Sequence, residues 1–271
     1  MTREAPPIEV DLTITVTDEA NHYILDLNQE DFSVLEDGTP QEILHFSKEL
    51  TPVSMAVVLD TSGSMRRRME SVQKAASRFV SQITPVDRAM VLEFSDGVRM
   101  TQGLTSDIPA LKRAIESTSA KGGTALYDAV IDAVRRLQRM RGRTSVILLT
   151  DGKDENNAGT AAGSHHTLAE CVETAKEAGV TIYTLGLGAN IARDVLTQIA
   201  RQTGGRAYFP PTVADLAEVY GKIAEELRSQ YTLSYSSSNR IRDGAWRNIE
   251  IKIAGHAYII RTKPGYFAPK R

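Results

Sequence analysis

The stretch MAVVLDTSGS, residues Met55–Ser64, decides the fold of this chain. Its first five residues are apolar, as expected of a strand that is buried on both faces of a parallel sheet. Its second half is polar and begins with Asp60. In α/β proteins, ligands bind beyond the carboxyl ends of such strands. The stretch therefore predicts a buried strand that leads directly into a functional loop.

Strands and helices alternate outward from this stretch, from Ser54 to about Ser229. A second apolar run, Val146–Leu149, predicts another buried strand, and the segments between the strands carry apolar residues at helical spacing. The alternation predicts a doubly wound, mainly parallel, six-stranded sheet with helices on both faces, the Rossmann-like arrangement. If the strand order is 3-2-1-4-5-6, the order reverses between the first and fourth strands.

The two ends of the chain contain alternating strands without helices. Asp37-Gly38 predicts a hairpin between the strands 32–35 and 42–46, and three more strands are expected at 230–235, 248–253 and 258–262. The simplest interpretation is one small all-β domain, a β-sandwich, formed by residues 1–52 and 229–271. The α/β domain of residues 53–228 is then inserted into it, as domains with neighbouring termini allow.

Composition excludes several classes of function. The chain has 32 basic and 34 acidic side chains and a formal net charge of -2, so it lacks the basic excess of nucleic-acid-binding proteins. Cys171 is the only cysteine, which excludes an internal disulfide and a cysteine-based metal site. No apolar stretch approaches the roughly 18 residues of a membrane span, and the polar first residues do not predict a signal peptide.

Oxygen-bearing side chains are expected to converge at the reversal of strand order. Asp60 and Asp151 end the two strands beside it, and Ser62, Ser64 and Thr124 lie in loops at the same edge. Oxygen ligands suit the hard cations Mg²⁺, Mn²⁺ and Ca²⁺. A divalent cation would also remove the repulsion between the two carboxylates. Neutral hydroxyls leave such a cation electrophilic, so it is expected to attract a carboxylate from outside.

The motifs Asp-Thr-Ser-Gly-Ser, Gly-Gly-Thr and Thr-Asp-Gly together resemble the metal-ion-dependent adhesion site of von Willebrand factor type A (VWA) domains, as in integrins. The resemblance covers about residues 53–228. It implies one divalent cation, Mg²⁺ before Mn²⁺ or Ca²⁺, with an Asp or Glu of a partner protein completing its coordination. It implies ligation, directly or through water, by Ser62, Ser64 and Thr124. Asp60 and Asp151 would in part contact these ligands and not the cation itself.

The flanking segments, around Leu35-Glu36-Asp37-Gly38 and Lys263-Pro264-Gly265-Tyr266, are similar to bacterial VWA-related proteins of the acidobacterial type. That resemblance implies an extracellular or periplasmic location. The sequence does not indicate an oligomeric state.

Simpler interpretations stand beside the metal site. Asp60 could serve as the N-cap of the following helix, and Arg66-Arg67-Arg68 could form a solvated helix face or attract an acidic partner. His165-His166 are ordinary loop histidines or, alternatively, a second metal site. The loop residues Asp154–Asn157 are surface residues first and determinants of partner choice second.

Three functions are compatible with these motifs. The favoured one is a binding module without enzymatic activity, which captures a partner carboxylate at the metal. A subunit-assembly protein would use the same site for a neighbouring subunit. The third is a metal-dependent hydrolase or phosphatase with Asp60 as nucleophile or ligand. Phosphotransferases of the haloacid dehalogenase type have a second aspartate where this chain has Ser62, and no phosphate-binding loop is present.

Overall fold

The computed structural model describes residues 7–48, 52–140, 142–188, 191–255 and 257–270. The chain divides into two compact units. The larger unit is Thr51–Glu225, and the smaller unit combines Met1–Leu50 with Glu226–Arg271. The boundary therefore falls in the last turn of a helix, Leu216–Arg228, which continues after Ser229 into a strand of the smaller unit.

The larger unit is built on a six-stranded sheet with the order β10-β9-β8-β5-β6-β7. All neighbouring strands are parallel except β7, which runs antiparallel to β6. This confirms the predicted fold class and the order 3-2-1-4-5-6. The strands are β5 (Val53–Asp60), β6 (Arg88–Phe94), β7 (Val98–Thr105), β8 (Arg143–Thr150), β9 (Thr181–Gly186) and β10 (Ala207–Tyr208).

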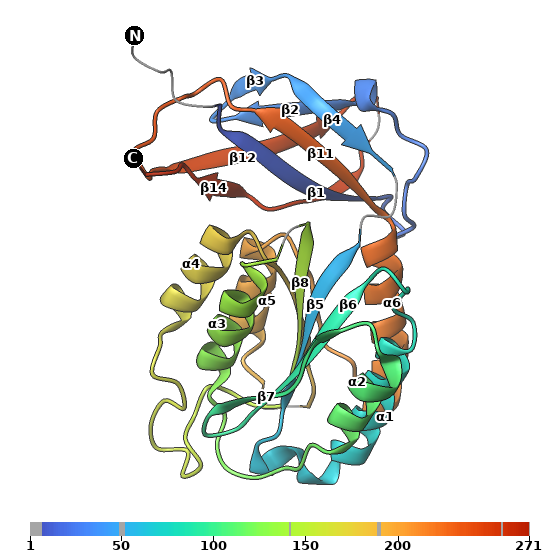
Figure 1. The fold of residues 1–271 in the computed structure, drawn as a ribbon, viewed down its shortest axis with the longest axis vertical. Helices are drawn as coiled ribbons and strands as arrows, with labels where there is room; N and C mark the ends of the chain where they lie inside the picture. Colours follow the sequence, from blue (N-terminus) through green and yellow to red (C-terminus); the bar gives the residue numbers. More distant parts are fainter. Residues whose placement is uncertain (1–6, 49–51, 141, 189–190, 256, 271) are drawn as a thin grey trace. The chain divides into compact units, whose positions relative to one another are not determined.

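Helices cover both faces of this sheet, α3, α4 and α5 on one side and α1, α2 and α6 on the other (Figure 1). Ala56 and Val58 of β5 pack in the core beneath α3 and α4, while Val57 and Leu59 alternate to the opposite face and are also fully buried. Burial on both faces explains the unbroken apolar run. The helices are α1 (Met69–Val80), α2 (Ile108–Glu116), α3 (Leu126–Leu137), α4 (Leu168–Ala178), α5 (Arg193–Gln202) and α6 (Leu216–Arg228), with short 3-10 helices η1 (Gln29–Asp31), η2 (Gly63–Arg67) and η3 (Val213–Asp215).

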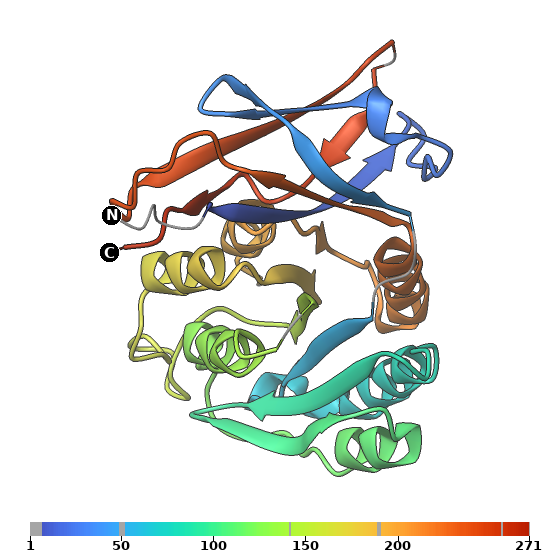
Figure 2. The ribbon, with the colours of Figure 1, turned by 45° about the horizontal axis from the view of Figure 1, so that its top comes forward.

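The smaller unit contains two four-stranded antiparallel sheets, β13-β1-β11-β4 and β14-β12-β2-β3. Each sheet combines strands from both ends of the chain, drawn in blue and in orange to red (Figure 2), and the two kinds alternate in the sheet β13-β1-β11-β4. Apolar residues of both sheets form one core. This confirms an all-β domain made from the two terminal segments. Its strands are β1 (Glu9–Thr17), β2 (Phe32–Glu36), β3 (Thr39–Gln41), β4 (Ile43–Ser47), β11 (Gln230–Ser236), β12 (Trp246–Ile253), β13 (Ile259–Arg261) and β14 (Gly265–Phe267).

The hairpin at Asp37-Gly38 exists, but its predicted second strand is wrong. Glu36 pairs with Thr39, so β2 turns directly into β3 rather than into residues 42–46. Both turn residues have positive φ, 47° at Asp37 and 80° at Gly38, as a tight two-residue turn requires. The segment predicted as the second strand is β4, which pairs with β11 in the other sheet.

A buried carboxylate joins strands from both ends of the smaller unit. Glu36 is 2% exposed and accepts hydrogen bonds from the hydroxyls of Tyr235 (2.8 Å), Ser237 (2.6 Å) and Tyr266 (3.1 Å). Burial raises the pKa of Tyr235, and so do its own hydrogen bond to Glu36 and the negative charge of that carboxylate. The three donors replace the water that the carboxylate loses on burial.

None of the helices within the described ranges is long and apolar enough to span a bilayer.

Candidate metal centre

The two predicted aspartates stand at the carboxyl ends of the adjacent strands β5 and β8. These strands pair in parallel, with Leu59 opposite Leu149, so the residues that follow each strand are neighbours. One oxygen of Asp60 accepts a hydrogen bond from the backbone N–H of Ser62 (2.8 Å), and the other accepts one from the Thr150 hydroxyl (2.6 Å). Both carboxylate oxygens are thereby oriented by the two loops.

The serine hydroxyls form a short chain that ends on Asp151. Ser62 Oγ lies 2.9 Å from Ser64 Oγ, and the Ser64 hydroxyl donates to Asp151 Oδ1 at 2.6 Å. Ser62, not Asp60, is the N-cap residue of η2, so the interpretation of Asp60 as a helix cap is wrong. The Ser62 hydroxyl makes no capping bond and is directed toward Ser64 instead.

Thr124 joins this group from a third loop. Its backbone pairs with that of Glu155 in both directions, at 2.8 and 3.2 Å, which ties the loop before α3 to the loop after β8. A Cβ atom added to Gly152 would lie 3.5 Å from Thr124 Oγ1, so this hydroxyl stands beside the residue that follows Asp151. Thr124 is 4% exposed.

The cluster is buried except at one point. Asp60, Ser62 and Asp151 are buried, whereas Ser64 is exposed. Burial raises the pKa of Asp60 to about 6; hydrogen bonds from Ser62 and Thr150 oppose this rise, and the negative charge of Asp151 adds to it. Two neighbouring carboxylates in a dry site favour an added positive charge.

The donor set fits a small hard cation. Two oxygen ligands at right angles around Mg²⁺, each about 2.1 Å from it, lie about 3 Å apart, and Ser62 Oγ and Ser64 Oγ are 2.9 Å apart. The Ser64 hydroxyl donates its proton to Asp151 and accepts that of Ser62, which leaves one lone pair of Ser64 Oγ to act as a ligand. Among the described residues, no three His, Cys, Asp or Glu side chains gather in a metal-binding group.

The family model of the von Willebrand factor type A domain matches residues 54–222. The chain belongs to the VWA domain family. Calcium-activated chloride channel regulator 1 of Bos taurus is 26% identical over 216 residues, which are 72% of this chain and 22% of that protein. The chain thus spans about a fifth of the length of this relative.

Solved structures show the same fold at low sequence identity. A von Willebrand factor type A protein from Catenulispora acidiphila has a TM-score of 0.58 at 15% identity, covering 99% of this chain and 74% of that one. The vWF domain of the type V pili tip protein Mfa5 from Porphyromonas gingivalis has a TM-score of 0.54 at 15% identity, covering 65% of this chain and 95% of that one. Bacterial VWA proteins are thus among its structural neighbours.

Arg68 of the VWA domain contacts the cluster, which the sequence did not predict. Its guanidinium donates a hydrogen bond to Asp151 Oδ2 from the turn between η2 and α1. Arg66 and Arg67 are exposed, as the helix-face interpretation predicted for the whole triplet. The sequence alone does not distinguish Arg68 from Arg66 and Arg67, because the partner of Arg68, Asp151, lies 83 residues away.

Asp154 is the second missed residue, and it is a structural clamp rather than a free surface side chain. Its carboxylate accepts hydrogen bonds from the backbone N–H of Leu126 (2.9 Å), at the start of α3, and from those of Gly163 (3.2 Å) and Ser164 (3.1 Å). It also accepts one from the Ser164 hydroxyl. The clamp connects the loop after β8 with the helix that follows Thr124.

His165 and His166 both form hydrogen bonds with the carboxylate of Asp128. Their Nδ1 atoms are 3.0 and 2.6 Å from the two oxygens of Asp128 on α3, which also accepts both backbone N–H groups. Partial burial raises the pKa of Asp128, but the hydrogen bonds from the two histidines outweigh it and lower the pKa to about 2. The pair anchors this loop to α3.

Asp128 gives the VWA domain an acid-sensitive contact. Since its pKa is lowered in the folded protein, its stabilising contribution is present above its ordinary pKa of about 4 and is lost as the pH falls toward 2. We expect Asp128→Asn to destabilise the protein at pH 7 and to flatten the loss of stability between pH 4 and 2. Urea unfolding at a series of pH values measures this; parallel wild-type and variant curves would contradict it.

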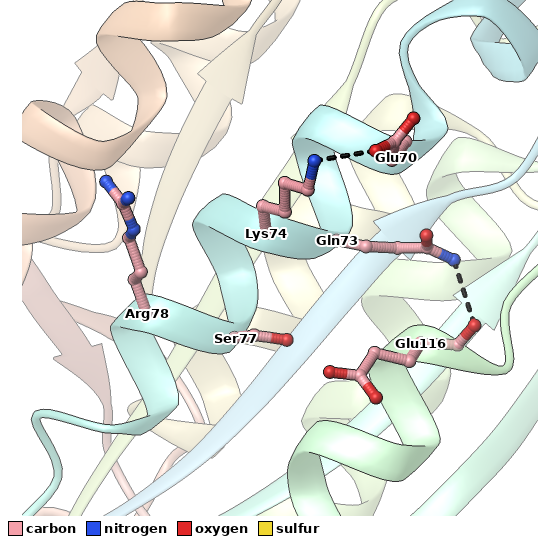
Figure 3. Close-up of a pocket in the computed structure, with 6 residues that line it drawn as sticks. All are labelled: Glu70, Gln73, Lys74, Ser77, Arg78 and Glu116. Carbon is pink, nitrogen blue, oxygen red and sulfur yellow. Dashed lines mark hydrogen bonds and ion pairs between the residues drawn. The ribbon is translucent and has the colours of Figure 1, made fainter.

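A separate hollow of about 390 Å³ lies between α1 and α2 and is lined by charges of both signs (Figure 3). Glu70 pairs with Lys74, and Gln73 donates to the backbone oxygen of Glu116, so much of its polar lining is already paired. The mixed charge gives it no preference for an anionic or cationic ligand. Its lining residues are Glu70, Gln73, Lys74, Ser77, Arg78 and Glu116.

Proposed function

We propose that this chain is a divalent-cation-dependent protein-binding or adhesion module. Its site holds one cation, Mg²⁺ in preference to Mn²⁺ or Ca²⁺, and captures an Asp or Glu of a partner protein. One observation carries the proposal: hydroxyls of Ser62 and Ser64 stand 2.9 Å apart and end on the buried carboxylate of Asp151. VWA domains typically mediate protein–protein interactions, which agrees with a role in binding.

In this proposal, the residues of the chain have distinct tasks. Ser62, Ser64 and Thr124 provide neutral oxygen ligands, while Asp60 orients the Ser62 loop and Asp151 orients the Ser64 hydroxyl. A bound divalent cation supplies a positive centre for an incoming carboxylate. Because Ser64 is exposed while its neighbours are buried, the partner approaches from the Ser64 side.

We further propose that the chain is not an enzyme and that it acts outside the cytoplasm. The oxygens of Asp60 are both engaged by hydrogen-bond donors, which disfavours a role as nucleophile. A pilus tip protein is among the proteins of similar fold, which favours a surface location.

Calorimetric titration of Mg²⁺, Mn²⁺ and Ca²⁺ into the chelator-treated full chain tests the site. We expect one equivalent to bind, and Asp60→Ala and Ser62→Ala to weaken binding by about 10- to 100-fold. Ser77→Ala is the matched control, because its hydroxyl has no hydrogen-bond partner among the described residues and lies on α1. Wild-type protein that binds no cation, or variants that bind as well as Ser77→Ala, would refute the proposal.

A further inference from the structure

Arg68 places a permanent positive charge at the predicted metal centre. Its guanidinium donates to Asp151 Oδ2, and the Asp151 side chain is 1% exposed whereas that of Arg68 is 38% exposed. A Cβ atom added to Gly188, just after β9, would lie 3.5 Å from Arg68 Nη2. The guanidinium therefore lies beside the residues that follow β8 and β9.

The two oxygens of Asp151 are thus divided between two partners. Oδ1 accepts from Ser64, which is one of the proposed ligands, and Oδ2 accepts from Arg68. An arginine stays protonated at any physiological pH, so its charge is always present. A divalent cation bound at Ser62 and Ser64 would lie close to the Arg68 guanidinium, because both interact with the Asp151 carboxylate. Two positive charges at such short range repel each other.

We propose that Arg68 is an internal cation that competes with the divalent cation for Asp151. The inference rests on the proposed metal site. In the metal-free protein, Arg68 neutralises Asp151 and keeps its carboxylate in position beneath Ser64. The bound divalent cation is then repelled by the guanidinium or displaces it from Asp151. The site therefore fills at a higher cation concentration than it would without Arg68.

Two charge-matched variants separate this local effect from general electrostatics. Arg68→Gln and Arg67→Gln remove the same charge from the same turn, but Arg67 is exposed and only Arg68 contacts Asp151. In calorimetric titrations of Mn²⁺ into the chelator-treated full chain, we expect Arg68→Gln to bind about tenfold more tightly than wild type. Arg67→Gln should stay within about twofold, since exposed charges interact weakly through water.

A second measurement is made without metal. Thermal unfolding of the chelator-treated variants should show a lower Tm for Arg68→Gln than for Arg67→Gln, because the former leaves a buried carboxylate without its cation. Arg68→Lys keeps the charge and should retain the weak, wild-type-like metal affinity.

The outcomes distinguish this inference from the metal site itself. If neither wild type nor Arg68→Gln binds Mn²⁺, both ideas fail. If wild type binds and Arg68→Gln binds equally or less tightly, the metal site stands and the competition is wrong. An equal gain in Arg67→Gln also overturns it, since the effect would then not pass through Asp151. Binding that appears only in Arg68→Gln supports the competition at Asp151, but it refutes the proposed function of the wild-type chain, whose site would then stay empty.

Discussion

Replacing Glu36 with alanine is expected to destabilise the smaller unit by about 2–4 kcal/mol. The substitution removes the common acceptor of Tyr235, Ser237 and Tyr266. Tyr235 is fully buried, so its hydroxyl cannot turn to water, and the lost side chain also leaves a cavity between the two sheets. Unsatisfied buried donors and a cavity are each destabilising, and here they occur together.

The single tryptophan makes this prediction measurable in a two-unit protein. Trp246 lies on β12 of the smaller unit, so the fluorescence change in urea reports unfolding of that unit. Glu42→Ala, at an exposed position nearby in the sequence, is the control and should change stability by less than about 0.5 kcal/mol. Equal midpoints for the two variants would show that the three hydroxyls find other acceptors.

Asp154→Ala is the second substitution with a large expected effect. It removes a charged acceptor from three backbone N–H groups, one of them at the start of α3, where negative charge also favours the helix dipole. We expect the larger unit to lose about 3 kcal/mol, since hydrogen bonds to charged groups contribute about 1.5–3 kcal/mol each and are not additive.

The same change should weaken metal binding although Asp154 is not a proposed ligand. Thr124 pairs through its backbone with Glu155, the residue after Asp154, so release of the loop displaces the Thr124 hydroxyl. We expect about tenfold weaker Mn²⁺ binding, measured by calorimetry beside urea unfolding followed by circular dichroism. Asp132→Ala is the control, because Asp132 pairs only with Arg136 within α3 in the described contacts. A variant indistinguishable from this control would remove Asp154 from any supporting role.

The arrangement of the larger unit followed from simple sequence patterns. Val57, Val58 and Leu59 are fully buried, and a run of this kind suits only a strand that is covered on both faces. The order of strands then brought Asp60 and Asp151 together, because parallel neighbours end at one edge of the sheet. These features depend on periodicity and topology, which a single sequence records.

The errors and omissions have a different physical origin. The predicted hairpin has the wrong second strand, because a two-residue turn at Asp37-Gly38 requires Glu36 to face Thr39, as observed. That signal was present in the sequence. No comparable signal marks Arg68 or Asp154, because the direction of each side chain is set by the packing of loops that are distant in sequence. The metal-binding role of the five predicted site residues stays a prediction, which the titrations test.

The interleaved strands of the smaller unit also bear on how the protein is made on the ribosome. In the sheet β13-β1-β11-β4, β11 lies between β1 and β4, and Ser47 pairs with Thr232. About 180 residues therefore have to be translated after β4 before its neighbour exists, which takes about 10–40 s at ordinary rates of synthesis. Throughout that interval, Leu12 and Ile14 of β1 lack the strand beside them.

The α/β unit has no such delay, because all its strands come from one continuous segment. It can fold before β1 to β4 have their partner strands. Its folding makes the segment that connects β4 with β11 compact, and these two strands pair with each other. The inserted domain thereby removes much of the entropy that closing so long a loop would otherwise require. The nascent chain is most exposed to aggregation and to proteases in the period before β11 emerges.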